Sequence, residues 1–506
     1  MNGAESLVAT MLAADVDVCF TNPGTSEMHF VAALDAAPAM RCVLALHEGT
    51  ATGAADGFFR VAGRPASTLL HLGPGLANGL SNLHNAKKAH SGVVNVVGEH
   101  ALPHIALDAP LTSDIEGIAR PVSHWVRTSS APGDLGRDGA AAIARARRGE
   151  VATLILPGDT AWTEGGEPAA SPAPASAPAV EDAAVEAAAE ALRGEGALLL
   201  LGTGALDEAA LNAAGRIAAA TGCGLLTEWS NAKLARGAGR VAVRRLPYPV
   251  DLAVETLAPY SRIVLAGAAR PVAFFAYPDK PGVLTRDDVA FTQLGEAGDD
   301  VAGALDALAD ALGAPASPAS VAEAATPAPP SGPLTHESLA AAIAAALPEN
   351  AIVIDESITT GRNFFAATAG APPHDWMNNR GGSIGYGMPL SVGAAIAAPD
   401  RKALAMIGDG SAMYSIQALW TLAREQLDVT VVIFANRTYE ILRGELANVG
   451  VRNPGPRAVD MLTLDRPELG FVHMAKGMGV DGLRVDEADA FFKALETGLS
   501  SPGPFL

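Results

Sequence analysis

Two uninterrupted apolar runs toward the C-terminal end of the chain give the clearest signal of secondary structure. Residues 403–407 and 429–435 have the length and the aliphatic content of buried strands. From Ser411 onward, the apolar residues between them recur at helical spacing: Ile416, Leu419, Trp420 and Ala423. The order strand, helix, strand predicts a βαβ unit with parallel strands and a right-handed crossover.

The same alternation of strands with Ala-rich helices recurs in three blocks of the chain, separated by two stretches rich in Ala, Pro and Ser. The blocks are residues 1–165, 181–312 and 334–506, and the linkers are 166–180 and 313–333. The other predicted strands are 16–21, 41–46, 66–72, 93–97 and 153–156, then 197–201, 224–227 and 261–266, and finally 351–355. We therefore predict an α/β fold with three doubly wound parallel-sheet domains.

Composition narrows the functional classes. At 506 residues the chain exceeds the size of a single core, which seldom passes about 250 residues. Its formal net charge of −20 argues against nucleic acid as a partner, because phosphate backbones are bound by clustered Lys and Arg. No apolar run reaches the roughly 18 residues of a membrane span. The first residues lack the basic start and apolar core of a signal peptide, so we expect a cytoplasmic protein with no membrane partner.

The three cysteines, Cys19, Cys42 and Cys223, sit in apolar surroundings without C-x-x-C spacing. This pattern predicts buried thiols in a reducing compartment and implies neither a disulfide framework nor a zinc site.

Polar groups follow both of the C-terminal strands. Asp409 lies directly after the first strand and Asn436 directly after the second. In a parallel sheet these residues emerge at neighbouring carboxyl ends, where open α/β sheets bind ligands. A carboxylate oxygen, an amide oxygen and a loop carbonyl near Thr438 are the hard ligands that Mg²⁺ takes when phosphates complete its octahedron. The sequence thus predicts a Mg²⁺ site formed by Asp409, Asn436 and Thr438.

The glycines on either side of Asp409 suit a phosphate group. Gly408 and Gly410 let the backbone approach a phosphate closely, and the N–H groups that open the helix at Ser411 favour an anion. An Asp-Gly pair alone marks an ordinary turn. At a strand end, with Asn closing the next strand, it resembles the diphosphate- and metal-binding motif of thiamine-diphosphate (ThDP) enzymes.

Further motifs extend this resemblance along the chain. They are Asn22-Pro23-Gly24-Thr25-Ser26-Glu27, His47-Glu48-Gly49, His71-Leu72-Gly73-Pro74-Gly75 and Gly381-Gly382-Ser383-Ile384-Gly385. In this order they resemble the ThDP-dependent 2-oxo acid decarboxylase and acetohydroxyacid synthase superfamily, above all acetolactate synthase large-subunit-like proteins and benzoylformate decarboxylase. The resemblance implies pyrimidine-binding, central and diphosphate-binding domains, in that order.

Glu48 matches the carboxylate that, in this family, contacts a ring nitrogen of the cofactor's pyrimidine and so helps to form its reactive carbanion. A buried glutamate needs a partner, and the resemblance implies that the pyrimidine ring is the partner. Without the resemblance, a glutamate that complements the dipole of a helix N-terminus would be an equally good interpretation.

The loop at Gly381–Gly382 resembles the one that bends the cofactor. The resemblance implies that the Gly382 carbonyl accepts a hydrogen bond from the cofactor's amine and that Ile384 wedges between its two rings. Thr359 matches a second contact to the diphosphate, and Tyr439 also falls among the cofactor-binding positions. An ordinary glycine-rich turn remains the alternative, notably for Ser383.

The same resemblance implies which residues face the substrate. Ser26 and His71 match positions that bind the substrate carboxylate and move protons in benzoylformate decarboxylase, a task that suits histidine. The second catalytic histidine of that enzyme falls here near Tyr277, which puts product protonation by that route in doubt. Ile441 and Leu442 match positions that line the substrate pocket, although two apolar residues on a helix also suit a core.

His47, His100 and His104 are additional candidates near the site, each with a structural role as the open alternative. The flavin-contacting pattern of acetolactate synthases is replaced at residues 266–271, and the G-x-G at Gly202-Thr203-Gly204 is weak. We therefore expect ThDP and Mg²⁺ as cofactors and no FAD.

Together, these expectations predict an enzyme that releases CO₂ from a small 2-oxo acid. Carboligation to a second carbonyl compound, as in acetolactate synthase, is the first choice because the second decarboxylase histidine is absent. Decarboxylation of an aromatic or branched 2-oxo acid is the alternative, and a catalytically weak ThDP-binding regulatory protein is a third. The resemblance also implies a homodimer or homotetramer in which Glu48 of one subunit faces Asp409 of another.

Overall fold

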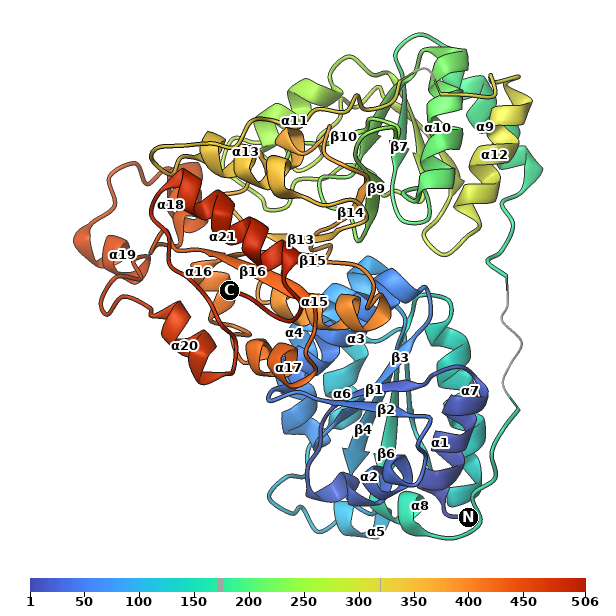
Figure 1. Cartoon of the computed structure of the whole chain (residues 1–506). Helices are drawn as coiled ribbons and strands as arrows, with labels where there is room; N and C mark the ends of the chain where they lie inside the picture. Colours follow the sequence, from blue (N-terminus) through green and yellow to red (C-terminus); the bar gives the residue numbers. More distant parts are fainter. Residues whose placement is uncertain (171–175, 319) are drawn as a thin grey trace.

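The structure is a computed structural model that describes residues 1–170, 176–318 and 320–506. It contains three sheets with helices on both faces, which confirms the predicted α/β class with three doubly wound domains (Figure 1). The N-terminal domain is blue in Figure 1, the central domain green, and the C-terminal domain orange and red. Within the predicted linkers 166–180 and 313–333, residues 171–175 and 319 lie outside the described residues.

The N-terminal sheet has six parallel strands in the order β2-β1-β3-β4-β6-β5. They are β1 (Val18–Asn22), β2 (Arg41–Leu44), β3 (Ala66–Leu70), β4 (Val93–Glu99), β5 (Trp125–Thr128) and β6 (Val151–Pro157). One face packs on α1 (Gly3–Ala13), α2 (Met28–Asp35) and α7 (Leu135–Ala146), and the other on α3 (Glu48–Ala62), α4 (Leu72–Ala89) and α6 (Ile115–Ala119). Burial on both faces explains why β4 and β6 are mostly apolar and are buried along their whole length.

The central sheet has five parallel strands in the order β10-β8-β7-β11-β12. They are β7 (Ala197–Leu201), β8 (Gly224–Thr227), β10 (Arg244–Arg245), β11 (Arg262–Ala266) and β12 (Ala290–Gly295). One face packs on α9 (Asp182–Leu192), α10 (Glu208–Thr221) and α12 (Val301–Ala311), and the other on α11 (Val250–Leu257).

The C-terminal sheet has the strand order β16-β15-β13-β14-β9. Its strands are β13 (Ile352–Glu356), β14 (His374–Met377), β15 (Ala403–Gly408), β16 (Val429–Phe434) and β9 (Leu234–Arg236). One face packs on α15 (Gly387–Ala397) and α17 (Ala418–Arg424), and the other on α13 (His336–Ala346) and α21 (Ala488–Ser500). Strand β9 comes from the central part of the chain and pairs antiparallel with β14, so this sheet departs from the purely parallel one that we predicted.

The apolar runs located the sheet cores well. Predicted strands 197–201 and 224–227 coincide with β7 and β8, and the parallel pairing of β15 with β16 is confirmed. The single helix predicted from Ser411 is wrong, because α16 (Asp409–Ala412) and α17 are separated by turns. These turns bring Tyr414 against Gly385, where an added Cβ would lie 2.5 Å from the Tyr414 Cβ. A tertiary contact thus interrupts the helical periodicity.

Two sequence expectations concern exposure. Cys19 and Cys223 are buried as predicted, but Cys42 is exposed, because it lies on β2 at the edge of its sheet. Burial raises the pKa of the Cys19 thiol to about 12. Among the described residues, no helix combines the length and the apolar content required to cross a bilayer.

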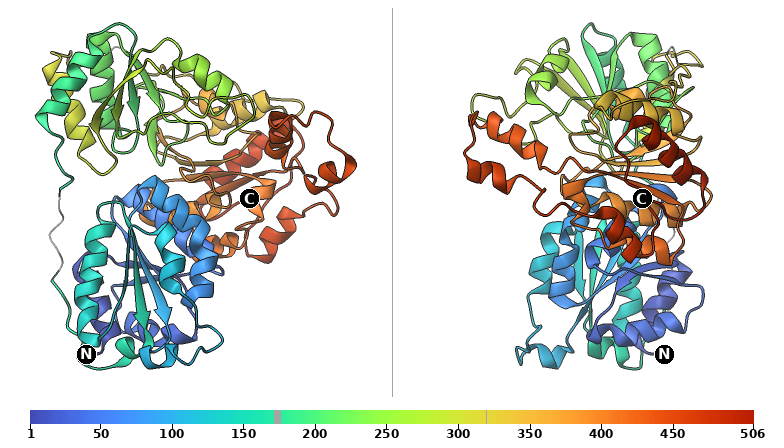
Figure 2. Two further views of the ribbon diagram at one scale, coloured as in Figure 1. Left: turned by 180° about the vertical axis from the view of Figure 1, so that it is seen from behind. Right: turned by 60° about the vertical axis from the view of Figure 1, so that its left-hand side comes forward.

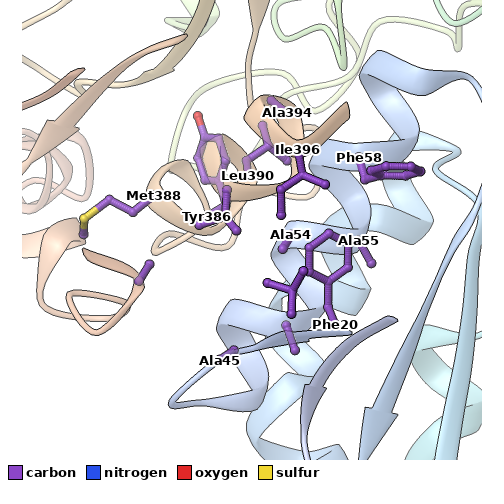
Figure 3. Packing of buried hydrophobic residues seen from close by; sticks show 14 of the residues in the cluster. Phe20, Ala45, Ala54, Ala55, Phe58, Tyr386, Met388, Leu390, Ala394 and Ile396 are labelled. Carbon is purple, nitrogen blue, oxygen red and sulfur yellow. The ribbon is translucent and has the colours of Figure 1, made fainter. Parts of the chain in front are cut away.

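A close helix contact joins the N-terminal and C-terminal domains. Helices α3 and α15 pack face to face, and Figure 3 shows Ala54, Phe58, Leu390 and Ile396 between them. Glycines permit this approach: a Cβ on Gly393 would lie 1.8 Å from the Ala54 carbonyl oxygen, and a Cβ on Gly57 2.1 Å from the Leu390 carbonyl oxygen. The two backbones therefore touch directly.

Arg60 extends this junction to the central domain. Its guanidinium forms a buried two-pronged ion pair with Asp56, with N–O distances of 2.7 and 2.6 Å. The same group donates to the carbonyls of Ala232 at 3.1 Å and Asn378 at 2.8 Å. Figure 2 shows the arrangement of the three domains from two further directions. One side chain from α3 therefore binds the backbones of both other domains.

We expect Gly393→Ala to lower the free energy of unfolding by about 1–3 kcal/mol, because its methyl group would overlap the α3 backbone. Gly444→Ala is the matched control, since a Cβ there meets nothing within 4 Å in α18 (Glu440–Asn448). In the control, the free energy of unfolding should stay unchanged or rise by up to about 1 kcal/mol. Urea unfolding of both variants measures the difference, and equal effects would contradict the close helix contact.

Candidate active site

The carboxyl ends of β13, β15 and β16 carry the predicted cofactor and metal residues. Asp409 follows β15 and is buried, with Oδ1 accepting a hydrogen bond from the Gly410 N–H at 2.8 Å and Oδ2 from the Arg437 N–H at 2.5 Å. The Arg437 guanidinium turns instead to Glu468, 3.3 Å away. Burial raises the pKa of Asp409, while the two backbone N–H groups lower it.

Asn436 and Thr438 follow β16 on the same edge of the sheet. The Thr438 N–H donates to Asn436 Oδ1 at 3.0 Å, and the Thr438 hydroxyl donates to the Leu462 carbonyl at 2.8 Å. Both residues line an open cleft of about 580 Å³ together with Thr359, which follows β13. Three of the predicted residues therefore border one cavity.

The glycine turn beside Asp409 is shaped for a close approach. A Cβ on Gly410 would lie 2.4 Å from the ring of Tyr439, so only glycine fits beneath this ring. Gly408 ends β15, and Ser411 is buried in the short helix α16. The oxygen ligands, the glycine turn and the buried carboxylate fit a divalent cation that carries a diphosphate.

Residues 379–385, which include Gly382 and Ile384, are held by the other two domains. Asn85 of α4 donates from Nδ2 to the Ser383 carbonyl at 2.9 Å and accepts from the Ser383 N–H at 3.2 Å. His84 Nε2 contacts the Gly381 carbonyl at 2.9 Å. From the central domain, the ring of Phe274 packs against Gly382, and a Cβ added to Gly382 would lie 2.4 Å from this ring.

Glu356 holds the far end of this loop from within the C-terminal domain. Its carboxylate ends β13, is fully buried, and accepts hydrogen bonds from the N–H groups of Gly385 at 2.5 Å and Gly387 at 2.6 Å. Burial raises the pKa of Glu356 to about 7, although these N–H groups and the Ser411 hydroxyl oppose the shift. Nothing in the sequence marks Glu356 as a partner of this loop, because Gly385 and Gly387 follow it by about thirty positions.

The N-terminal domain brings together Glu48 and His71. Glu48 is the first residue of α3, is buried, and accepts from Asn78 Nδ2 at 3.0 Å. A Cβ on Gly75 would lie 3.1 Å from Glu48 Oε1 and 3.2 Å from the His71 Cβ. Ser26 is half-buried in the turn at Thr25–Glu27, which follows β1.

The structure adds one acidic residue that the sequence analysis missed. His71 Nδ1 lies 2.8 Å from Glu27 Oε2, which also accepts from the Gly24 N–H at 2.8 Å. The other oxygen, Oε1, is packed against Gly98 on β4. Burial raises the pKa of Glu27, while His71 and the Gly24 N–H lower it. Glu27 belonged to a recognised motif, but only the fold reveals its contact with His71.

The other histidine candidates make local contacts. His47 Nδ1 accepts from the Gly49 N–H at 3.0 Å and caps α3. His100 and His104 lie side by side, with ring centroids 5.3 Å apart.

The predicted substrate residues come from the central domain and from α18. Ile441 and Leu442 lie on α18, which buries none of its residues, so the core interpretation does not hold for them within one chain. Tyr277 is half-buried and lies near Glu445 of α18 and Tyr248. Burial and these two neighbours raise the pKa of Tyr277 well above its ordinary value.

Comparison with known families agrees with this arrangement. The description "Thiamine pyrophosphate enzyme, N-terminal TPP binding domain" matches residues 1–117, and "Thiamine pyrophosphate enzyme, C-terminal TPP binding domain" matches residues 360–506. The chain belongs to the family of ThDP-dependent enzymes.

Individual relatives cover the chain from end to end. The chain is 52% identical over 509 residues to the Mycobacterium tuberculosis protein named "Putative acetolactate synthase large subunit IlvX", covering 100% of this chain and 98% of the relative. It is 30% identical over 516 residues to benzoylformate decarboxylase of Pseudomonas aeruginosa, covering 96% and 94%. The solved structure of the ThDP-dependent 4-hydroxybenzoylformate decarboxylase of Rhodococcus jostii RHA1 shares the fold, with a TM-score of 0.87, 24% identity, and coverage of 100% and 98%.

The pKa of Glu356 predicts how stability depends on pH. Its value of about 7 in the folded protein lies above the ordinary 4.5, so between these values the folded protein holds a proton that the unfolded chain has released. The free energy of unfolding should therefore fall by about 3 kcal/mol as the pH rises through this window. In Glu356→Gln this part of the decline should vanish. Urea unfolding without cofactor at about pH 5 and about pH 7.5 tests it, and identical declines in both proteins would refute it.

Proposed function

We propose that this ThDP-dependent enzyme requires Mg²⁺, releases CO₂ from a 2-oxo acid and joins the remaining carbon unit to a second carbonyl compound. The main support is a pair of complementary half-sites. One half-site has the buried Asp409 beside Asn436 and Thr359, and the other has Glu48 beside His71. The first suits a metal-bound diphosphate, and the second suits a heterocycle whose protonation must be controlled.

The C-terminal residues would bind the two ends of the cofactor. Asp409, Asn436 and the backbone at Thr438 would hold Mg²⁺. Gly408, Gly410, Ser411, Thr359 and Tyr439 would surround the diphosphate. The Gly382 carbonyl and the Ile384 side chain would set the angle between the cofactor's rings. When bound, ThDP supplies the nucleophilic carbon and the electron sink that loss of CO₂ requires.

The N-terminal residues would handle protons and orient the substrate. The Glu48 carboxylate, oriented by Asn78, would share a proton with the pyrimidine ring. His71, fixed by Glu27, would exchange a proton with the substrate, and Ser26 would bind the substrate carboxylate. Tyr277, Ile441 and Leu442 would line the substrate pocket.

A second copy of the chain would complete the site. The partner of Glu48 is in its own domain, as are the partners of Asp409. A homodimer, or a homotetramer built from dimers, would place Glu48 of one subunit against the cofactor held by the other. This arrangement would also cover Leu442, which is 43% exposed in the single chain.

Simple decarboxylation is the second candidate, and the contact between His71 and Glu27 favours it because it provides a positioned proton carrier. Benzoylformate decarboxylase is also among the relatives of the chain. Tyr277 argues for carboligation, because it stands near the position of that enzyme's second catalytic histidine, and a phenol transfers protons near neutral pH less readily than an imidazole.

A panel of 2-oxo acids separates the candidates. The protein with Mg²⁺ and ThDP is incubated with pyruvate, branched 2-oxo acids and benzoylformate, and CO₂ and products are measured by mass spectrometry. We expect CO₂ from at least one acid together with a 2-hydroxy ketone or 2-hydroxy-2-methyl-3-oxo acid product. An aldehyde as the sole product would favour decarboxylation. Tight ThDP binding without CO₂ from any acid would contradict both.

Two substitutions test the assigned roles. Glu48→Gln should lower turnover by about 10²–10⁴-fold, because a proton-transfer group is lost, yet leave the affinity for ThDP with Mg²⁺ nearly unchanged. Asp409→Ala should weaken that affinity by at least about tenfold, because a charged ligand is lost. Isothermal titration calorimetry and turnover assays measure both effects. Equal loss of affinity in the two variants would show that the roles are misassigned.

A further inference from the structure

Glu356 touches three segments of the candidate site. It ends β13, binds the Gly385 N–H with Oε1 and the Gly387 N–H with Oε2, and its backbone pairs with Ile407 of β15, next to Gly408. Gly385 closes the loop that carries Gly382 and Ile384, whereas Gly408 begins the glycine turn after β15. One residue therefore joins the loop expected at the cofactor's rings to the strand end that carries the turn expected at its diphosphate.

The surroundings of Glu356 are shaped for this carboxylate. A Cβ on Gly387 would lie 2.7 Å from Glu356 Oε2 and 2.3 Å from Ile407 Cδ1, so a larger residue at 387 would push the carboxylate away. Gly385 has a φ of +85°, which favours glycine and aims its N–H at Oε1. Glycine is thus favoured at both donor positions, at Gly385 by its backbone conformation and at Gly387 by the lack of space for a side chain.

Burial of this carboxylate is costly for the fold. Within the part of the chain that the structure describes, the hydrogen-bond partners of this carboxylate are backbone N–H groups, and no Lys or Arg side chain forms an ion pair with it. An apolar residue of similar volume would fill this place at lower cost in stability. Residues retained at such a cost are concentrated at functional sites.

We propose that Glu356 is a positioning residue for the cofactor. It fixes the loop 381–385 relative to the turn 408–411, and so sets the distance between the groups that hold the two ends of ThDP. This inference rests on the proposed function, because it assigns both segments to the same cofactor.

A purely local role would be to cap α15, since a carboxylate at a helix N-terminus stabilises the helix. Helix α15 begins at Gly387, and only Oε2 serves it. Oε1 instead binds Gly385, which precedes the helix. A cap alone would affect stability and leave cofactor affinity unchanged, so the two roles differ in a measurable way.

The test compares Glu356→Gln with Asp138→Asn. Asp138 is also a buried carboxylate, accepting from Ser129 and Arg127, but it lies in the N-terminal domain on α7. Titration calorimetry with ThDP and Mg²⁺ should show affinity weakened by about tenfold or more in Glu356→Gln, because the amide NH₂ cannot accept from an N–H group and leaves either Gly385 or Gly387 without its buried partner. Asp138→Asn should bind within about twofold of the unaltered protein, whatever its melting temperature.

Hydrogen–deuterium exchange supplies a second readout that needs no cofactor. The amides of residues 385–387 should exchange faster in Glu356→Gln and at the original rate in Asp138→Asn. If Glu356→Gln does not fold, Glu356→Asp replaces it, because it keeps the charge but falls one methylene short of the two N–H groups. The same direction is expected.

The outcomes separate this inference from the proposed function. Unchanged ThDP affinity and a lowered melting temperature in Glu356→Gln would reduce Glu356 to a cap and overturn the inference, while the proposed function would stand. If the unaltered protein does not bind ThDP, the proposed function fails, and the positioning role fails with it. Weakened affinity together with faster exchange only at residues 385–387 supports the inference.

Discussion

The backbone contact between α3 and α15 is the constraint on which the rest of the structure depends. Glu48 opens α3, and the loop at Gly381–Gly385 leads into α15, so this helix contact sets the geometry between the two. Gly57 and Gly393 remove the side chains that would hold the axes apart. Arg60 then ties the pair to the central domain. Because the two helices pack closely, the polar groups that they carry are held in fixed positions.

The loop at residues 379–385 shows how three domains can share the ordering of one segment. Asn85 binds the backbone of Ser383 as a neighbouring strand would, satisfying one N–H and one carbonyl. Phe274 occupies the space above Gly382, and Glu356 fixes the exit of the loop. A loop with so many external partners is organised before any ligand arrives, which reduces the entropy lost on binding.

The sequence alone predicted those features of the structure whose signals lie within one short segment of the chain. Long apolar runs identified β15 and β16, and the positions of Asp409 and Asn436 at the ends of these strands followed from their parallel pairing. The fold class followed from the repeated alternation of strands and helices. Assignments of Glu48 and His71 needed the family resemblance, because nothing near them in the sequence indicates their chemistry.

Features that depend on contacts between distant segments could not be predicted from the sequence. Glu27 looks like any glutamate in a turn until β4 buries it and His71 approaches. Strands β9 and β14 are short and carry His, Asp and Arg, so they lack the apolar period of a strand. They become strands through pairing with distant segments, β14 with β13 and β9 with β14. Tyr414, placed against Gly385, interrupts a helix that its own sequence favours. In each case a contact between segments far apart in the chain outweighs the local pattern.

Strand β9 gives the chain a particular order of assembly. It is made well before β14, the strand that it pairs with, and it forms the outer edge of the C-terminal sheet. During synthesis this segment must wait unpaired until β14 has emerged. A C-terminal fragment made alone would expose the open edge of β14, which invites pairing between copies. The domains are therefore distinct in sequence but interdependent in folding, and the natural unit for expression or for exchange between relatives is the entire chain.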